Sequence, residues 1–472
     1  MRLRPLLLAV LALALLVAAG PAHAGEPTRS YTSRPDLKPV VVRVLHAEAG
    51  LAPGAIFLAP KRGPGQGGPL IMGEDGQPIW FHPRSDGRRA TDFRVQTYAG
   101  QPVLTWWEGI ATGGRGTGEG VIADASYRVI ARVRTGNGVR MDLHEFTLTL
   151  RGTALVIAYH DRARDLRAWG GSKRGRVTDG VVQEIDVATG RVLFQWNAMG
   201  SVPLTDTYRR MTRGRAPWDP FHLNSVDEEP DGDLLVSARH TNTVYEIDRA
   251  TGKVRSRIGG KRSSFKMGEG TRFGLQHDAR AQADGTIRIF DNGLRGERRR
   301  SRALWIRLDR QAGTATLARS VQHPLQILAG TQGNAQPLPN GDTFFGWGSQ
   351  GRLSELSPDG GLLLDLRLPH GFDTYRAYRQ PWVGRPATSP AIAAETRHDG
   401  GTTVYTSWNG ATEVAAWQVL AGDSAATLQV VGTAPRRGFE TQIRLPALAP
   451  AARVRALDAS GAVLGQSRVV SS

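Results

Sequence analysis

The sequence contains no cysteine. A chain without cysteine forms no disulfide, no thiolate nucleophile and no cysteine-ligated metal site, so these three kinds of chemistry are excluded. Its stability must come from buried apolar surface, which a chain of 472 residues is long enough to provide. Apolar residues at the helical spacing are also almost missing beyond residue 24, and this absence excludes a mainly α-helical fold.

Several familiar catalytic motifs are missing as well. The chain has no His-Glu-x-x-His zinc motif, no Gly-x-Ser-x-Gly nucleophile turn and no Walker phosphate loop. The glycine-rich stretch GGRGTGEG (113–120) opens no helix and is interpreted as a flexible loop. We therefore expect neither a cofactor nor a metal ion.

The first 24 residues, MRLRPLLLAVLALALLVAAGPAHA, form the one long apolar run. Arg2 and Arg4 precede it, and Ala-His-Ala comes directly before Gly25, which is typical of a secretory signal peptide over residues 1–24. A membrane anchor is the alternative, but its apolar core would be longer. We expect a secreted, extracellular protein without a transmembrane segment after cleavage.

The chain is strongly basic, with a formal net charge of +17 that falls to +15 once Arg2 and Arg4 are removed. Such a balance favours anionic partners or substrates. The run RGERRRSR (295–302) resembles a nucleic-acid contact, but it lacks interleaved aromatic residues and lies between two strand patterns. We interpret it as a solvated loop and expect no nucleic-acid partner.

Short apolar runs separated by glycine turns recur as two kinds of hairpin. The outer kind carries an Asp-x-x-Gly or related turn and occurs at 69–83, 120–133, 181–196, 243–258, 304–319 and 353–368. The inner kind precedes most of them, at 91–109, 143–160, 221–240, 276–292 and 333–349, and a partial sixth copy lies at 40–60. Six pairs of hairpins predict an all-β fold, a six-bladed β-propeller over residues 25–388, with a β-sandwich as the alternative.

The pattern changes at about residue 388. The segment WVGRPATSPAI with its two prolines marks the junction, and short strands such as TTVYTSWNG and EVAAWQVLAG follow. Residues 389–472 are long enough for a small β-sandwich. We expect this C-terminal module to be a place for cell-surface or glycan contact.

The inner hairpin FHLNSVDEEPDGDLLVSARH (221–240) carries unusual polar residues. A turn centred on Pro230-Asp231 places His222 opposite Arg239 and Asn224 opposite Ser237, on one face. The equivalent positions of other inner hairpins hold His144, His277 and Asn334. Because the inner strands of a propeller surround its axis, these side chains are expected to line one funnel.

This set of side chains suits the transfer of an oxyanionic group. A neutral imidazole is a nucleophile and a proton shuttle, while Arg239 and the amides offer donors to oxygen atoms. Asp142, Glu145 and Asp278 alternate to the other strand face, so neither a glycosidase carboxylate pair nor a hard-cation site is expected. A zinc site of three histidines remains an alternative. The residues do not decide between phosphorus and sulfur.

Three short motifs resemble the bacterial arylsulfate sulfotransferases. They are His-x-Asn-Ser at 222–225, Ser-x-Arg-His at 237–240 and Gln-His-Asp at 276–278. The phrases LTWWEG, DLHEF and RFGLQHDAR resemble the actinobacterial and fungal branch, over roughly residues 30–390. The C-terminal segment is similar to a fibronectin type III module. Unlike the Gram-negative enzymes, this chain has no disulfide, and their different N-terminal extension is missing.

The resemblance implies a six-bladed propeller that moves a sulfuryl group from an aryl sulfate ester to a phenol without a nucleotide donor. By motif match, His277 is the nucleophile that becomes sulfohistidine, His222 shuttles the proton and His144 assists. Arg239 and Asn224 are expected to hold the sulfuryl oxygens, and Asn334 joins them as a substrate-binding residue. Two further hypotheses are a non-catalytic propeller that binds acidic or sulfated ligands, and a metal-dependent propeller hydrolase or lactonase.

Overall fold

The computed structural model describes residues 27–84, 86–211, 216–293 and 300–471. The expected signal peptide (1–24) and most of the basic run 295–302 lie outside these ranges. Half of the chain is strand and 4% is helix, so the predicted all-β class is confirmed. Among the described residues no helix is long and apolar enough to cross a membrane.

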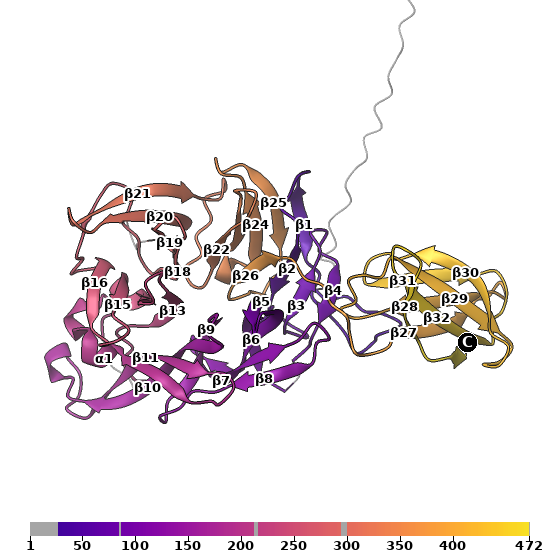
Figure 1. Ribbon diagram of the computed structural model, residues 1–472, viewed down its shortest axis with the longest axis horizontal. Helices are drawn as coiled ribbons and strands as arrows, with labels where there is room; N and C mark the ends of the chain where they lie inside the picture. Colours follow the sequence, from indigo (N-terminus) through magenta and orange to yellow (C-terminus); the bar gives the residue numbers. More distant parts are fainter. Residues whose placement is uncertain (1–26, 85, 212–215, 294–299, 472) are drawn as a thin grey trace, which may run out of the picture.

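Most strands lie in sheets that surround a common centre (Figure 1). One four-stranded sheet is formed by β13 (Leu223–Glu228), β14 (Leu234–Ala238), β15 (Thr243–Ile247) and β16 (Val254–Gly259). The next contains β18 (His277–Ala281), β19 (Thr286–Asp291), β20 (Arg302–Asp309) and β21 (Thr314–Val321), with the short β17 (Lys266–Met267) on its edge. A third contains β22 (Asn334–Pro337), β23 (Thr343–Gly346), β24 (Arg352–Leu356) and β25 (Leu362–Arg367).

An eight-stranded sheet occupies another part of the ring. Its first four strands are β5 (Arg89–Tyr98), β6 (Gln101–Thr112), β7 (Arg115–Ala123) and β8 (Val129–Val133). The other four are β9 (Arg140–Leu148), β10 (Thr153–Arg164), β11 (Gly175–Asp186) and β12 (Val192–Asn197). A single residue pair, Gly118 with Met141, joins the two groups, so each group is a four-stranded antiparallel unit.

The two ends of the ring are interlocked. β26 (Ala377–Gln380) pairs with β2 (Ala55–Leu58), which continues into β3 (Leu70–Met72) and β4 (Pro78–Phe81), while β1 (Arg43–Ala47) pairs with β25. The prediction of an inner hairpin at 40–60 was therefore wrong, because β1 and β2 belong to different sheets. Each completes a sheet with strands from the far end of the ring, which leaves fewer unpaired edges.

The glycine-rich stretch 113–120 was also predicted wrongly as a loop. Only Gly113 and Gly114 form the turn, and the rest belongs to β7. Side chains at Gly116 and Gly118 would begin about 2.6 Å from ring atoms of Trp107, which is fully buried. The glycines are therefore required by the packing of a tryptophan across the strand pair.

Hydrophobic clusters fill the space between neighbouring sheets. One cluster combines Leu155 and Val182 of the β9–β12 unit with Val226 and Tyr245 of the next sheet, and all four are fully buried. Helical pieces are few among the described residues: α1 (Ala198–Ser201) and four single 3-10 turns at Arg167–Trp169, Leu204–Asp206, Arg239–Thr241 and Gly348–Gln350. The turn at Arg239–Thr241 directly follows β14 and carries two residues of the site below.

The C-terminal part forms two further sheets around one hydrophobic cluster (Figure 1). The first contains β27 (Ala391–Thr396), β28 (Thr402–Ser407) and β31 (Glu440–Leu445), and the second β29 (Ala416–Gly422), β30 (Gln429–Pro435), β32 (Ala451–Leu457), β33 (Val463–Gln466) and β34 (Val470–Ser471). Asn409 bonds both backbone groups of Phe81 at 2.9 and 3.0 Å, so the module is fixed to the ring by a peptide-like contact.

Candidate active site

The inner strands lose their regular register near the centre of the ring. The shifts lie between Thr91 and Arg94 in β5, Met141 and Phe146 in β9, Leu223 and Ser225 in β13, and His277 and Arg280 in β18. Asp92, His222 and Asp278 have positive φ angles of 55°, 53° and 50°. Bulges of this kind redirect side chains and are common beside active sites.

The hairpin 221–240 shows what a bulge changes. The turn is one residue longer than predicted, because Glu229 pairs with Asp233. A bulge at Asn224 adds one residue to the other strand, so the two changes cancel for residues before the bulge. His222 therefore does lie opposite Arg239, whose N–H donates to the His222 carbonyl at 2.9 Å. Ser225, instead of Asn224, stands opposite Ser237. The prediction for Asn224 failed because period-two alternation does not hold across a bulge.

A cavity of about 430 Å³ opens where these strands meet. Four of the six predicted site residues line it: His144, His222, His277 and Arg239. Its lining also includes five further cations, namely Lys61, Arg62, Arg89, Arg115 and Arg209, and one carboxylate, Asp219. Such a surplus of positive charge in a recess attracts anions.

His277 is held as a neutral imidazole with a defined proton position. Its Nδ1 lies 2.7 Å from Asn292 Oδ1, and the Asn292 amide nitrogen donates to the carbonyls of Ala329 and Gln332. Asn292 must therefore accept the Nδ1 proton, so Nε2 keeps its lone pair, which accepts the Gln332 N–H at 3.2 Å. Burial, with Arg239 nearby, holds the pKa of His277 well below its ordinary value. Nε2 is therefore the nitrogen that can attack, once the Gln332 N–H moves off its lone pair.

His222 and His240 are both organised by Asp219, which sequence reasoning missed. One Asp219 carboxylate oxygen accepts the His222 backbone N–H at 2.9 Å and the other accepts Nδ1–H at 2.7 Å. The Asp219 carbonyl accepts Nδ1–H of His240 at 2.8 Å. Burial lowers the pKa of His222, and it lowers that of His240, beside His222, to about 3. Both rings are therefore neutral.

Arg239 is positioned from both ends of its guanidinium. Nη1 lies 3.1 Å from His240 Nε2, and Nη2 donates to the Gly330 carbonyl at 3.0 Å. Because the other ring nitrogen of His240 donates to a carbonyl, Nε2 is the acceptor for Arg239. His240 matched the family motif, but its role in holding Arg239 becomes visible only in the structure.

His144 completes the group that we call the histidine cluster: His144, His222, His240 and His277. The ring centroid of His144 lies 4.9 Å from that of His222 and 5.4 Å from that of Tyr375. Asp142 forms a short hydrogen bond to His144 Nδ1. The expectation that Asp142 turns to the other strand face was wrong, because residues two apart in a strand share a face.

The two predicted amides lie outside the cavity lining. Asn224 is fully buried and donates to the Gln276 carbonyl at 2.6 Å. Asn334, also fully buried, exchanges two hydrogen bonds with the backbone of Ala377 at 2.8 and 2.9 Å. Asn334 connects neighbouring sheets in the manner of a peptide group, and Asn224 does so through its donor alone. Their placement gives no support to the substrate-binding role expected for them.

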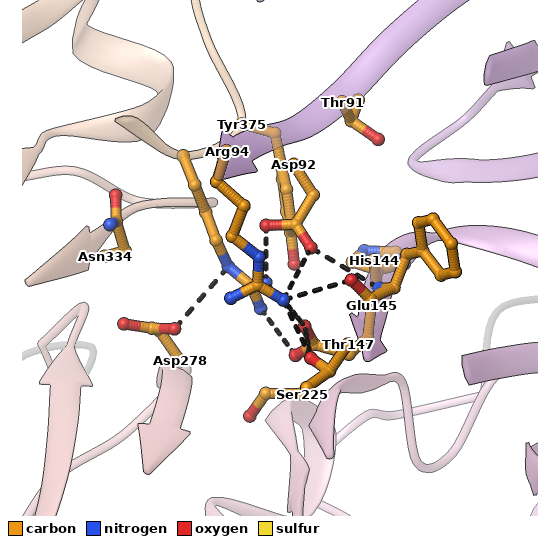
Figure 2. A network of polar contacts seen from close by, with 12 residues as sticks. Thr91, Asp92, Arg94, His144, Glu145, Thr147, Ser225, Asp278, Asn334 and Tyr375 are labelled. Atoms are coloured by element: carbon orange, nitrogen blue, oxygen red, sulfur yellow. Dashed lines mark hydrogen bonds and ion pairs between the residues drawn. The ribbon is translucent and has the colours of Figure 1, made fainter. Parts of the chain in front are cut away.

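A second cluster lies on the other side of the same inner strands. We call it the charge cluster: Asp92, Glu145 and Asp278 with Arg94, Arg280 and Arg376. Arg376 is fully buried and donates to Asp92 at 2.9 Å and to Glu145 at 3.0 and 3.1 Å. In Figure 2 the side chains of Asp92, Arg94 and Glu145 converge, and Asn334 lies apart from them. Burial would raise the pKa of Asp92, but Arg94 and Arg376 lower it below its ordinary range.

Among the described residues, one group has potential metal-ligating atoms close together: Asp219, His222 and His240. It is not the trio of histidines considered from the sequence. Both nitrogens of His240 already have hydrogen-bond partners, and one of these is the Arg239 guanidinium. A cation at this point would face another cation, so the donor set does not fit a metal ion.

The inner strands and the turns beside them bring histidines and an arginine to one cationic cavity. Such a site suits an anionic group. Residues 94–368 match the arylsulfotransferase (ASST) family. Since the match spans more than half of the chain, the chain belongs to this family. Membership supports an aryl sulfotransferase activity and implies small aryl substrates. No curated protein matches the chain.

Solved structures with a similar course of the chain are distant. A protein of unknown function from Bacteroides caccae is 14% identical with a TM-score of 0.41, over 69% of this chain and 98% of that one. A protein from Lactobacillus plantarum is 12% identical with a TM-score of 0.37, over 84% of this chain and 100% of that one. A catalytically inactive variant of virginiamycin B lyase from Staphylococcus aureus, solved with quinupristin, is 9% identical with a TM-score of 0.31. The similarity covers 68% of this chain and 86% of that one.

Proposed function

We propose that this protein is a secreted sulfotransferase that moves a sulfuryl group from an aryl sulfate ester to a phenol through a sulfohistidine at His277, without a nucleotide donor. The observation that carries the proposal is the fixed tautomer of His277. A neutral imidazole whose Nε2 lone pair borders a cationic cavity combines a nucleophile with a binding site for an anionic ester.

The first half-reaction forms the Nε2–S bond and breaks the bond from sulfur to the aryl oxygen. The imidazole gains positive charge, which the Asn292 carbonyl oxygen stabilises through the Nδ1–H bond. The Gln332 N–H, which contacts Nε2 at rest, then lies beside the sulfuryl oxygens, and the Arg239 guanidinium adds charged donors. In the first turnover His222 is neutral, so an acidic phenol departs as the anion. In later turnovers, the proton that His222 Nε2 took from the preceding acceptor phenol returns to the leaving phenolate.

The second half-reaction runs the same steps in reverse with another phenol. His222 Nε2 takes the phenol proton, the phenol oxygen attacks sulfur and the S–N bond breaks. Asp219 accepts Nδ1–H of His222 and so leaves Nε2 as the base. His144, in ring contact with His222, is proposed to assist by packing and hydrogen bonding.

We also propose that the ring comprises six four-stranded blades within 25–388, followed by a fibronectin type III-like sandwich over 389–472. Counting β5–β8 and β9–β12 as separate units supports six blades. One shared hydrophobic cluster between two sheets supports the sandwich. Secretion follows from the sequence of residues 1–24 alone, and glycan contact by the C-terminal module remains an expectation.

The experiment is intact mass spectrometry of the mature protein after mixing with 4-nitrophenyl sulfate, without nucleotide or acceptor. We expect a gain of one sulfuryl group on the peptide that contains His277, together with release of one equivalent of nitrophenol. A phenol acceptor should remove the group and restart release.

The matched variants are His277→Asn and His46→Asn, because His46 is an exposed histidine outside the cavity lining. The first should lose both the mass gain and the nitrophenol burst, and the second should keep them. Nitrophenol release by His277→Asn at the wild-type rate would refute the proposed nucleophile. Loss of activity on treatment with a chelator, and recovery with one divalent ion, would favour a metal-dependent hydrolase instead.

A further inference from the structure

A second group of cations lines the same cavity and has no role in the steps above. It consists of Lys61, Arg62 and Arg89, which we call the cationic wall. Lys61 follows β2 and is fixed by two backbone hydrogen bonds with Asp373, at 2.9 and 3.1 Å, and Arg89 begins β5. All three residues precede residue 94, where the match to the family begins. They therefore belong to a part of this chain that the family model does not describe.

Lys61 is a buried cation beside the nucleophile. It is 7% exposed, and its ammonium donates to Gln332 Oε1 at 2.6 Å and forms a short ion pair with Asp373. The backbone N–H of the same Gln332 donates to His277 Nε2. A single residue thus separates the ammonium from the reacting nitrogen. Two of the three ammonium N–H groups have described partners, and the side chain borders the cavity.

The cationic wall has more positive charge than its surroundings neutralise. Asp373 is shared by Lys61 and by Arg62, whose guanidinium lies 3.4 Å from it. The partly buried Arg89 side chain forms no hydrogen bond or ion pair with any residue in the described ranges. Burial lowers the pKa of Lys61 to about 8, and this shift reflects the free-energy cost of holding the ammonium there. Three positive charges near one carboxylate are not neutralised, so a further anion would be attracted to them.

A simple aryl sulfate does not account for this charge. Its sulfate ester carries a single negative charge, which is placed against His277, Arg239 and the Gln332 N–H in the proposed reaction. A substituent on the aryl ring that carries a second negative charge would instead reach the cationic wall, because Lys61 and the reacting nitrogen are linked through Gln332 within one cavity.

We propose that Lys61, Arg62 and Arg89 form a subsite for a second anionic group, a carboxylate or a further sulfate, on the aromatic ring of the substrate. This inference rests on the proposed function, and it names the substrate class: aryl sulfates and phenols that carry an additional negative charge. Since donor and acceptor rings occupy the cavity in turn, the same subsite selects both.

The experiment compares two acceptors that differ in charge alone. With 4-nitrophenyl sulfate as donor, kcat/KM is measured for 4-hydroxyphenylacetate and for its neutral amide, 4-hydroxyphenylacetamide, and for the 3-hydroxy isomers of both. The methylene group keeps the two phenols electronically similar. We expect wild-type protein to prefer the carboxylates, and Arg89→Gln to reduce that ratio about tenfold, the value of one charged hydrogen bond. Arg62→Gln should reduce it less, because Arg62 is half exposed.

The matched control is Arg174→Gln, which removes the same charge at an exposed position outside the cavity lining. It should keep the wild-type ratio. Equal use of carboxylate and amide by wild-type protein, or a preference that survives the double Arg62→Gln, Arg89→Gln variant, would overturn the subsite while leaving the transferase intact.

Calorimetric binding of 4-hydroxyphenylacetate separates this failure from failure of the proposed function, because it needs no turnover. Binding that weakens about tenfold in Arg89→Gln and is unchanged in Arg174→Gln supports the subsite even if no sulfuryl transfer is found. The absence of carboxylate binding, or equal binding by both variants, would overturn it.

Discussion

The histidine cluster and the charge cluster share the inner strands β9 and β18, yet they bury polar groups in opposite ways. His144 and Glu145 are neighbours in β9, and His277 and Asp278 are neighbours in β18. In each pair the histidine lines the cavity, and the acid is buried against Arg376 and Arg280.

The difference lies in the charge state that burial permits. In the histidine cluster, burial lowers the pKa of His222, His240 and His277, so the rings stay neutral and ready to react. In the charge cluster, every carboxylate has a guanidinium partner, so the ions persist and hold the strands together. The histidine cluster thus supplies reactive side chains, and the charge cluster stabilises the fold.

The largest expected effect is on activity, from His277→Gln. Loss of the nucleophile should reduce sulfuryl transfer by at least about a thousandfold, as is usual when such a group is removed. The free energy of unfolding should change by less than about 2 kcal/mol, because the two neutral hydrogen bonds of the ring, to Asn292 and from the Gln332 N–H, contribute about 1 kcal/mol each. Initial rates and urea denaturation measure both quantities. A large loss of stability would show that the histidine cluster is also architectural.

The converse change is Arg376→Met in the charge cluster. Removing the fully buried guanidinium takes away one of the two arginines that Asp92 and Glu145 share, the other being Arg94, which should cost about 3 kcal/mol of unfolding free energy. The control, Arg385→Met, breaks an exposed pair with Glu413 and should leave the free energy of unfolding almost unchanged. Equal effects of the two variants in urea denaturation would contradict an architectural role for the charge cluster.

A smaller effect is expected from Asp219→Asn, which changes a proton position in the histidine cluster. The His222 backbone N–H requires an oxygen, so the new amide nitrogen must face His222 Nδ1 and force the ring proton onto Nε2. Transfer to phenols should fall by about ten- to a hundredfold. The loss should be greater for donors with weakly acidic phenols than for 4-nitrophenyl sulfate. A uniform loss across donors would indicate a structural role alone.

The last expected effect is absent at neutral pH and appears only in acid. His240 has a pKa of about 3 in the fold and about 6.5 when unfolded, so the unfolded chain binds the additional proton between these values. Its contribution is present above pH 6.5 and is lost as pH falls toward 3, at about 1.4 kcal/mol per pH unit. His240→Gln should flatten the pH dependence of unfolding free energy in this range, and His46→Gln should not. Parallel curves of unfolding free energy against pH for wild type and His240→Gln would refute the proposed contribution of His240.

Much of the fold was predictable because hairpins are local. Alternating apolar residues and glycine turns located the outer hairpins and five of the inner ones, and the recurrence of histidine at one hairpin position identified His144, His222 and His277. The pairing of β1 with β25 was not predictable in this way, since the partners lie over 300 residues apart. The predicted pairing of Asn224 with Ser237 failed because the alternation of apolar and polar residues in this strand does not indicate a bulge.

The sequence by itself determined the all-β class, the hairpin repeat and the histidines and arginine that meet at the cavity, because these depend on local pattern and on repetition. The tertiary structure alone decided the chemical state of those residues. Asp219, Asn292 and Lys61 reach the site from loops or strands of other sheets, and they fix tautomers and charge through contacts that no local pattern encodes. Bulges at the crowded centre then determine which of two adjacent side chains enters the cavity.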